Sequence, residues 1–160
     1  RAVEIKNAIR HHITVSLNDD PAHYRKLSER LEEIIQKYYD NWEEQARQLL
    51  LFKEECMNEP TPPEGLTNAE LPFYNLYTEV LEKHFDEDEV PYEDAKKIAS
   101  ELVAYLNEVS QIVDFFNKPD EIRRLKRKIN DLILQTDHSD QDLIDNITER
   151  FMDLAQHKYA

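Results

Sequence analysis

The chain has 160 residues, 34% of them charged, and a formal net charge of −14 at pH 7. Its single cysteine excludes an internal disulfide and fits a reducing, cytoplasmic location, and no run approaches the roughly 18 apolar residues of a membrane span. Glycine occurs once, whereas tight hairpins usually need several glycines, so the composition predicts an all-α fold. The acidity disfavours nucleic acid and acidic membranes, so any contact with DNA must be local.

The first predicted helix has no visible start. Ala2, Ile5, Ile9 and Ile13 recur at helical spacing from the second residue, and no capping Ser, Thr, Asp or Asn precedes them. We therefore expect the chain to be a fragment of a longer protein. The helix should end at a hinge, residues 18–21.

The second predicted helix opens with Asp20 as its cap and Pro21 in its first turn. It should run to about Met57, with a bend near residues 40–41. The apolar residues that define its buried stripe are Leu27, Leu31, Ile34, Tyr38, Trp42, Ala46 and Leu49. Tyr39 lies off this stripe and is the best candidate for a surface contact with a partner protein.

Prolines divide the rest of the chain. Residues 58–68 hold three prolines and the single glycine, so they form the clearest loop. The chain is predicted to be one domain, 1–160, with a possible subdivision around this loop into 1–58 and 67–160. Four helices should follow: from Thr67 or Leu71 to about Phe85, from Pro91 to about Asn117, from Pro119 onward, and a last one capped by Ser139. The result is an irregular bundle of five to six helices, long at the N-terminus and shorter afterwards.

Several segments of the first two helices are similar to a known family. These segments are Ala8-Ile9-Arg10-His11-His12-Ile13, Asp19-Asp20-Pro21, Tyr24, Lys26-Leu27-Ser28-Glu29-Arg30-Leu31 and Ile34-Ile35. Through them, the start of the chain resembles the C-terminal region of the motor (R) subunits of type I restriction enzymes. The resemblance implies a parent subunit that uses ATP and Mg²⁺ to translocate duplex DNA, cleaves foreign DNA, and joins methyltransferase and specificity subunits.

No catalytic, cofactor or metal site and no small-molecule substrate is predicted for this fragment. A phosphate-binding loop needs a glycine-rich GxxxxGK[ST] motif, which the chain lacks. The acidic residues 86–89 follow a helix end and indicate a solvated turn, while Asp120 and Glu121 suit the first turn of a helix, where the macrodipole favours acids. His11 and His12 are adjacent, so on a helix they point about 100° apart and cannot share a small ion.

One basic segment remains as a candidate site. Residues 118–128 carry six positive and two negative charges, which is +4 net and leaves −18 on the remainder of the chain. On a helix, Ile122, Leu125 and Ile129 form the buried stripe and the cations face outward, the geometry for contacting DNA phosphates. The predicted DNA-binding residues are Arg123, Arg124, Lys126, Arg127 and Lys128.

The alternative interpretation of this segment is an ordinary solvated helix face. Asp120 lies four residues before Arg124 and Asp131 lies four residues after Arg127, and such helical pairs contribute about 0.3 kcal/mol each. A smaller basic face on the first helix, Arg10 and His11 with Lys6, is a weaker candidate for partner binding.

Two functions remain open. In the first, the chain is a non-catalytic module that serves assembly with the methyltransferase and contacts the DNA backbone non-specifically. In the second, it is an acidic adaptor that binds only protein, or imitates the charge of DNA. The basic segment separates the two, because a DNA mimic gains nothing from a +4 helix.

Overall fold

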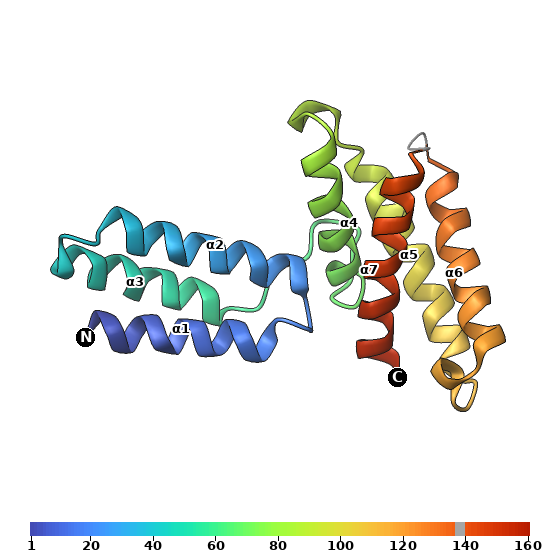
Figure 1. The fold of residues 1–160 in the computed structure, drawn as a ribbon, viewed down its shortest axis with the longest axis horizontal. Coiled ribbons are helices and arrows are strands. Elements are labelled where there is room, and N and C mark those ends of the chain that lie inside the picture. Colours follow the sequence, from blue (N-terminus) through green and yellow to red (C-terminus); the bar gives the residue numbers. More distant parts are fainter. Residues whose placement is uncertain (137–139) are drawn as a thin grey trace. The chain divides into compact units, whose positions relative to one another are not determined.

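The computed structural model describes residues 1–136 and 140–160, and within these the chain is all-α, with seven α-helices, two short 3-10 helices and no strand (Figure 1). The α-helices are α1 (Ala2–Ser16), α2 (Pro21–Lys37), α3 (Trp42–Met57), α4 (Leu71–His84), α5 (Tyr92–Val109), α6 (Pro119–Leu134) and α7 (Gln141–Tyr159). The 3-10 helices are η1 (Glu87–Glu89) and η2 (Phe115–Asn117). The all-α class is confirmed. The expected number of helices was too low. The expected shortening toward the C-terminus is also wrong, because α4 to α7 have 14 to 19 residues and α1 to α3 have 15 to 17.

The additional helix arises because the long second helix is interrupted. α2 ends at Lys37, and Asn41 caps α3 by accepting a hydrogen bond from the backbone N–H of Glu44 at 3.2 Å. An Asn side chain that bonds nearby backbone groups competes with helix continuation, and the unbroken apolar spacing did not reveal this. Trp42, expected in the core, therefore begins a helix and is 74% exposed.

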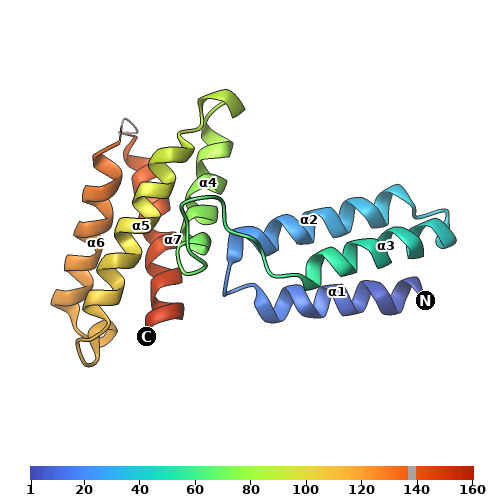
Figure 2. The ribbon, with the colours of Figure 1, turned by 180° about the vertical axis from the view of Figure 1, so that it is seen from behind.

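The chain forms two compact units, Arg1–Thr61 and Pro62–Ala160, here called unit 1 and unit 2. In unit 1, α1 packs against α3 and α2, and α2 packs against α3 (Figure 2). Ile9, Leu31 and Leu49 are at most 1% exposed at the centre of this three-helix arrangement. Asp20 caps α2 as predicted, by accepting a hydrogen bond from the N–H of His23.

Unit 2 contains α4 to α7, with α4 packed against α5 and α7, and α6 packed against α7 and α5. Its centre is aromatic: the ring of Phe151 lies 5.7 Å from that of Phe73 and 5.9 Å from that of Tyr77. Thr67 and Glu70 form the predicted reciprocal capping box, with hydrogen bonds of 2.8 and 3.3 Å, and α4 starts directly after it. The helix start near Leu71 is thus confirmed.

Two further helix ends differ from expectation. α5 stops at Val109 instead of continuing to about Asn117. In the turn that follows, Asp114 adopts a left-handed backbone conformation (φ 54°), which a continuous helix over this segment could not contain. The predicted cap Ser139 lies outside the described residues; among those described, Asp140 caps α7 by accepting a hydrogen bond from the N–H of Asp142 at 2.9 Å. No helix in the described part of the chain combines the length and apolarity that crossing a bilayer requires.

Candidate functional site

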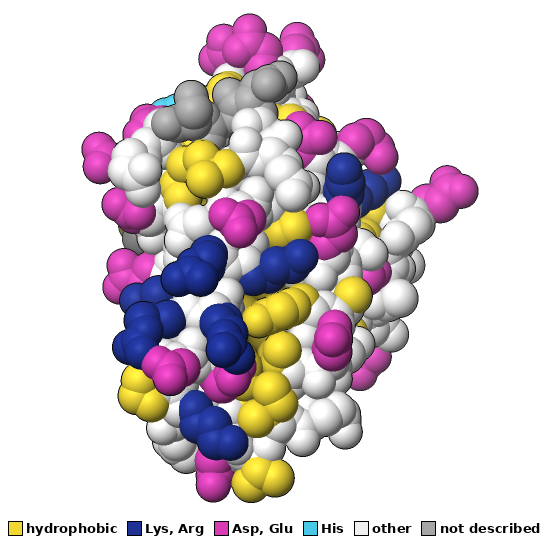
Figure 3. All heavy atoms as spheres, turned by 90° about the vertical axis from the view of Figure 1, so that its right-hand side faces the viewer, with side chains coloured by type: hydrophobic (Ala, Val, Ile, Leu, Met, Phe, Trp, Pro, Cys, Tyr) yellow, Lys and Arg dark blue, Asp and Glu magenta, His cyan; other side chains and the backbone are white. Residues whose placement is uncertain are grey.

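The basic residues of α6 form a solvent-facing ridge on unit 2. Leu125 and Ile129 are buried beneath it, while Arg123, Arg124, Lys126 and Arg127 are exposed and Lys128 is half-buried. We call these five cations, residues 123, 124 and 126–128, the α6 ridge. Figure 3 shows Lys and Arg side chains gathered on this face of the molecule, with acidic side chains interspersed among them. The surface around the ridge therefore carries both positive and negative charges.

Two of the ridge arginines pair with the first turn of their own helix. Arg123 bonds to Asp120, and Arg124 donates to the Glu121 carboxylate at 2.9 Å. The expected partner of Arg124, Asp120, was therefore wrong, and the expected pair between Arg127 and Asp131 is absent among the described residues. Both arginine side chains are 65% exposed. The Asp120 side chain is 79% exposed, so its pair with Arg123 contributes only about 0.2–1 kcal/mol, whereas the Glu121 side chain is 17% exposed.

Lys128 anchors the ridge to the neighbouring helix. Its ammonium lies 5.8 Å from the centre of the Tyr105 ring on α5, a cation–π distance. Burial raises the pKa of the Tyr105 phenol. Lys128 is consequently the least available cation of the ridge, and Arg127, with no carboxylate within ion-pair distance among the described residues, is the most available.

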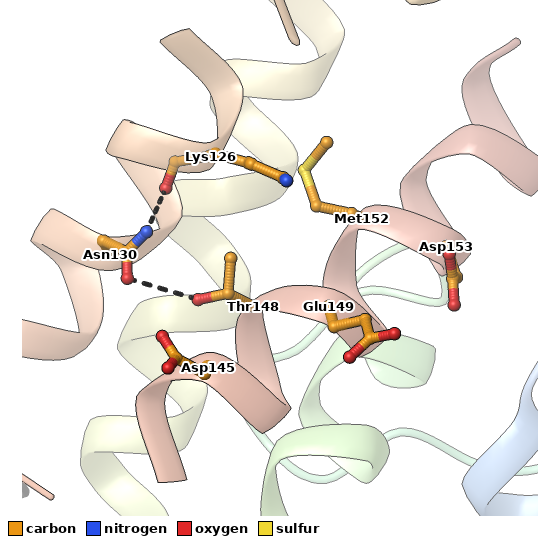
Figure 4. Close-up of a pocket in the computed structure, with 7 residues that line it drawn as sticks. All are labelled: Lys126, Asn130, Asp145, Thr148, Glu149, Met152 and Asp153. Carbon is orange, nitrogen blue, oxygen red and sulfur yellow. Dashed lines mark hydrogen bonds between the residues drawn. The ribbon is translucent and has the colours of Figure 1, made fainter. Parts of the chain in front are cut away.

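A groove of about 500 Å³ runs between α6 and α7 beside the ridge (Figure 4). Its lining residues are Lys126 and Asn130 of α6 and Asp145, Thr148, Glu149, Met152 and Asp153 of α7. Asn130 donates to the Lys126 carbonyl at 2.8 Å, and Thr148 donates to Asn130 at 3.5 Å. The Lys126 side chain points toward Met152, and three carboxylates border the same groove.

These α7 carboxylates lower the positive potential at Lys126 and were missed by sequence reasoning. They lie about twenty residues away from the ridge along the chain, so only the antiparallel packing of α6 and α7 brings them beside it. Their spacing did carry a signal: Asp145, Glu149 and Asp153 are four residues apart, which puts them on one helix face. Lys126 is thus a weaker candidate for phosphate binding than the ridge arginines.

The candidate partner-binding residues do not form one cluster. Arg10 pairs with Glu32 of α2 at 2.9 Å, and His11 is exposed on α1. Tyr39 lies seven residues beyond Glu32, in the turn after the end of α2, and is 69% exposed. Sequence reasoning missed the exposure of its neighbour Trp42, because the residue lies on the apolar period of the preceding helix.

Residues 2–159 match the model of a protein family described as type I restriction enzyme HindI endonuclease subunit-like, C-terminal. The chain belongs to this family. It is also similar to a protein of Methanocaldococcus jannaschii assigned as the MjaIXP endonuclease subunit of a type I restriction enzyme, with 26% identity over an alignment covering 99% of this chain. The chain spans 16% of the length of that relative. No solved structure matches the chain.

Within this C-terminal endonuclease-subunit domain, the described residues contain no group of three or more His, Cys, Asp or Glu placed to hold a metal ion. The acidic segment 86–89 is an exposed turn that includes η1. Cys56 is 1% exposed, and burial, with a smaller contribution from the Glu55 carboxylate, raises the pKa of its thiol to about 11. It lies in the core of unit 1, not at a reactive surface.

We expect Cys56 to react with iodoacetamide at pH 8 at least about 100-fold more slowly in the folded chain than in urea. Two pKa units reduce the thiolate fraction about a hundredfold, and burial slows access further. Mass spectrometry of quenched samples measures both rates, with a free cysteine peptide correcting for the effect of urea on alkylation. Equal corrected rates would show that α3 opens readily.

Proposed function

We propose that this chain is a non-catalytic helical module of a type I restriction endonuclease subunit. In this proposal, it contacts the backbone of duplex DNA through the α6 ridge and takes part in assembly with the methyltransferase and specificity subunits. Membership in the family supports the assignment to the endonuclease subunit. The DNA contact rests on the ridge alone, and the parent's ATP- and Mg²⁺-dependent chemistry would belong to other parts of the subunit.

The observation that carries the proposal is the way in which the ridge arginines are paired. The Asp120 carboxylate is 79% exposed, so a DNA phosphate can replace it beside Arg123 at little cost, whereas the Glu121 carboxylate is only 17% exposed and holds Arg124 more firmly. Arg127 is exposed and has no carboxylate partner among the described residues. Arg123 and Arg127 can therefore turn toward a phosphate backbone without breaking a buried interaction, and the Arg124 side chain is 65% exposed beside Glu121.

The charge of the surroundings limits the affinity of this contact. Unit 2 contains 11 Lys and Arg residues and 22 Asp and Glu residues, so its formal net charge is −11 although the segment 118–128 contributes +4. At 0.1 M salt, charges within about 10 Å still act on an approaching phosphate. DNA binding by the free domain should be weak, whereas an assembled enzyme that holds DNA nearby raises its local concentration.

The test is a charge reversal of Arg123, Arg124 and Arg127 to Glu in the full-length subunit. Losing three phosphate contacts should reduce the slope of log K against log salt by about three, because each contact contributes about 0.9. DNA affinity is measured by fluorescence anisotropy over a range of salt concentrations. The matched control reverses three exposed lysines of unit 2, Lys83, Lys97 and Lys158, and changes the net charge equally.

The control should keep the wild-type slope. A wild-type slope for the arginine variant would instead mean that the ridge is a solvated face. If the arginine variant binds DNA normally but no longer joins the methyltransferase, the ridge belongs to the assembly interface. That outcome would favour the second candidate function, a protein-only adaptor. The three α7 carboxylates beside the ridge also support this candidate.

A further inference from the structure

The turn between α2 and α3 lies at one end of unit 1 (Figure 1). Two large aromatic side chains in this segment are exposed to solvent. Tyr39 is 69% exposed and Trp42 is 74% exposed, the largest exposures of any aromatic residue in the described chain. We call these two residues the aromatic tip. Trp and Tyr are the side chains most often found at the energetic centre of protein interfaces, so two of them on one exposed turn indicate a binding surface.

The backbone beneath the aromatic tip is held by several hydrogen bonds. The side chain of Gln45 donates to the carbonyls of Ile35 and Tyr38, at 3.2 and 3.4 Å, and so ties α3 to the end of α2. The N–H of Asn41 donates to the Tyr38 carbonyl at 3.1 Å, and the Asn41 side chain caps α3. The turn is thus ordered before any partner arrives, which lowers the entropic cost of binding.

Acidic side chains flank the aromatic rings. Asp40 and Glu43 are exposed, and no Lys or Arg lies within ion-pair distance of either among the described residues. Glu44, by contrast, is already engaged by Arg47 and Gln48. The neighbouring ring of Tyr38 already carries the ammonium of Lys37 at 5.4 Å. Aromatic faces beside unpaired carboxylates are the chemistry that attracts a cationic side chain.

This charge pattern decides between the classes of partner. Phosphates of DNA and headgroups of acidic lipids would meet Asp40 and Glu43, which repel them. A basic protein segment would place its cations between the carboxylates and the rings. We propose that the aromatic tip binds an arginine- or lysine-bearing segment of a protein partner, with Trp42 as the principal ring. This site is independent of the DNA contact proposed for the α6 ridge.

Trp42 itself provides the measurement, because it is the only tryptophan of the chain. Its emission therefore reports on the aromatic tip even if a cationic ligand also binds elsewhere on this acidic protein. The probe is a short peptide without aromatic residues that alternates Arg and Leu, added to the 160-residue chain. We expect a saturable change in Trp42 emission that weakens as the salt concentration rises, and no such change with the same peptide carrying Glu in place of Arg.

Two charge-matched variants test the role of the flanking carboxylates. D40N/E43Q should bind the Arg peptide roughly threefold to tenfold more weakly by Trp42 emission, since it loses two favourable ion contacts. D86N/E87Q, which removes two exposed carboxylates of unit 2, should bind like the wild type. The proposal is overturned if Trp42 emission does not respond to the Arg peptide, if both variants weaken binding equally, or if duplex DNA produces the larger response.

Discussion

Replacing Phe151 with alanine is expected to lower the free energy of unfolding of unit 2 by about 3–5 kcal/mol. Phe151 is 0% exposed, and its ring contacts those of Phe73 and Tyr77, which are also fully buried. Removing it loses the transfer free energy of the ring and leaves a cavity between α4 and α7, which the closely packed neighbours cannot close. Urea unfolding followed by circular dichroism measures the loss.

The matched control for this substitution is Leu134→Ala, because Leu134 is 56% exposed at the end of α6. An exposed side chain contributes little to burial, so this variant should lose less than about 1 kcal/mol. If Phe151→Ala unfolded at the same urea concentration as the control, α7 would not be the helix that closes the core of unit 2.

Replacing Arg150 with alanine should cost about 3 kcal/mol of unfolding free energy. Arg150 donates to the Glu79 carboxylate at 3.2 Å and to Asn146 at 2.6 Å, and so links α7 to α4. The Glu79 side chain is only 8% exposed, so after the substitution its charge stays buried without the guanidinium. Desolvated charges that lose a partner destabilise far more than exposed ones.

The comparison for Arg150 is Arg123→Ala, which removes an exposed pair with Asp120 and should cost less than about 1 kcal/mol. A double variant, Glu79→Met with Arg150→Met, should recover most of the stability lost in Arg150→Ala, because an apolar pair of similar volume avoids the buried charge. Equal losses from Arg150→Ala and Arg123→Ala would mean that water reaches Glu79. Both comparisons use the same urea titration.

Local signals in the sequence predicted the helix starts that are set by capping residues or by proline. Three helix starts were predicted from short-range chemistry, and the structure shows all three. They are Asp20 before Pro21, the capping box at Thr67 and Glu70, and Pro119. The break after Lys37 was missed, because Asn41 interrupts a run whose apolar spacing continues through it. Periodicity reports which face is buried in a helix and contains no information on whether the helix is continuous.

The candidate site, like the fold, was predictable only from features within one helix. Which α6 residues face outward follows from the helical period of their own helix. Two other features depend on which helices pack together: the position of the α7 carboxylates beside Lys126 and the exposure of Trp42. A sequence window of a few residues contains no information about helix packing. The function of the ridge depends on this second kind of information, so the sequence alone left both interpretations open.

The pairing of α4 with α7 has a consequence for how the protein is made. Nine of the fourteen residues of α4 are buried, and its partners Arg150 and Phe151 follow about seventy residues later in the chain. During synthesis, α4 leaves the ribosome well before the helix that covers it, and its aromatic surface stays open to solvent or to chaperones in the interval. A nascent chain halted before α7 would carry this uncovered surface, which makes it a target for aggregation and quality control.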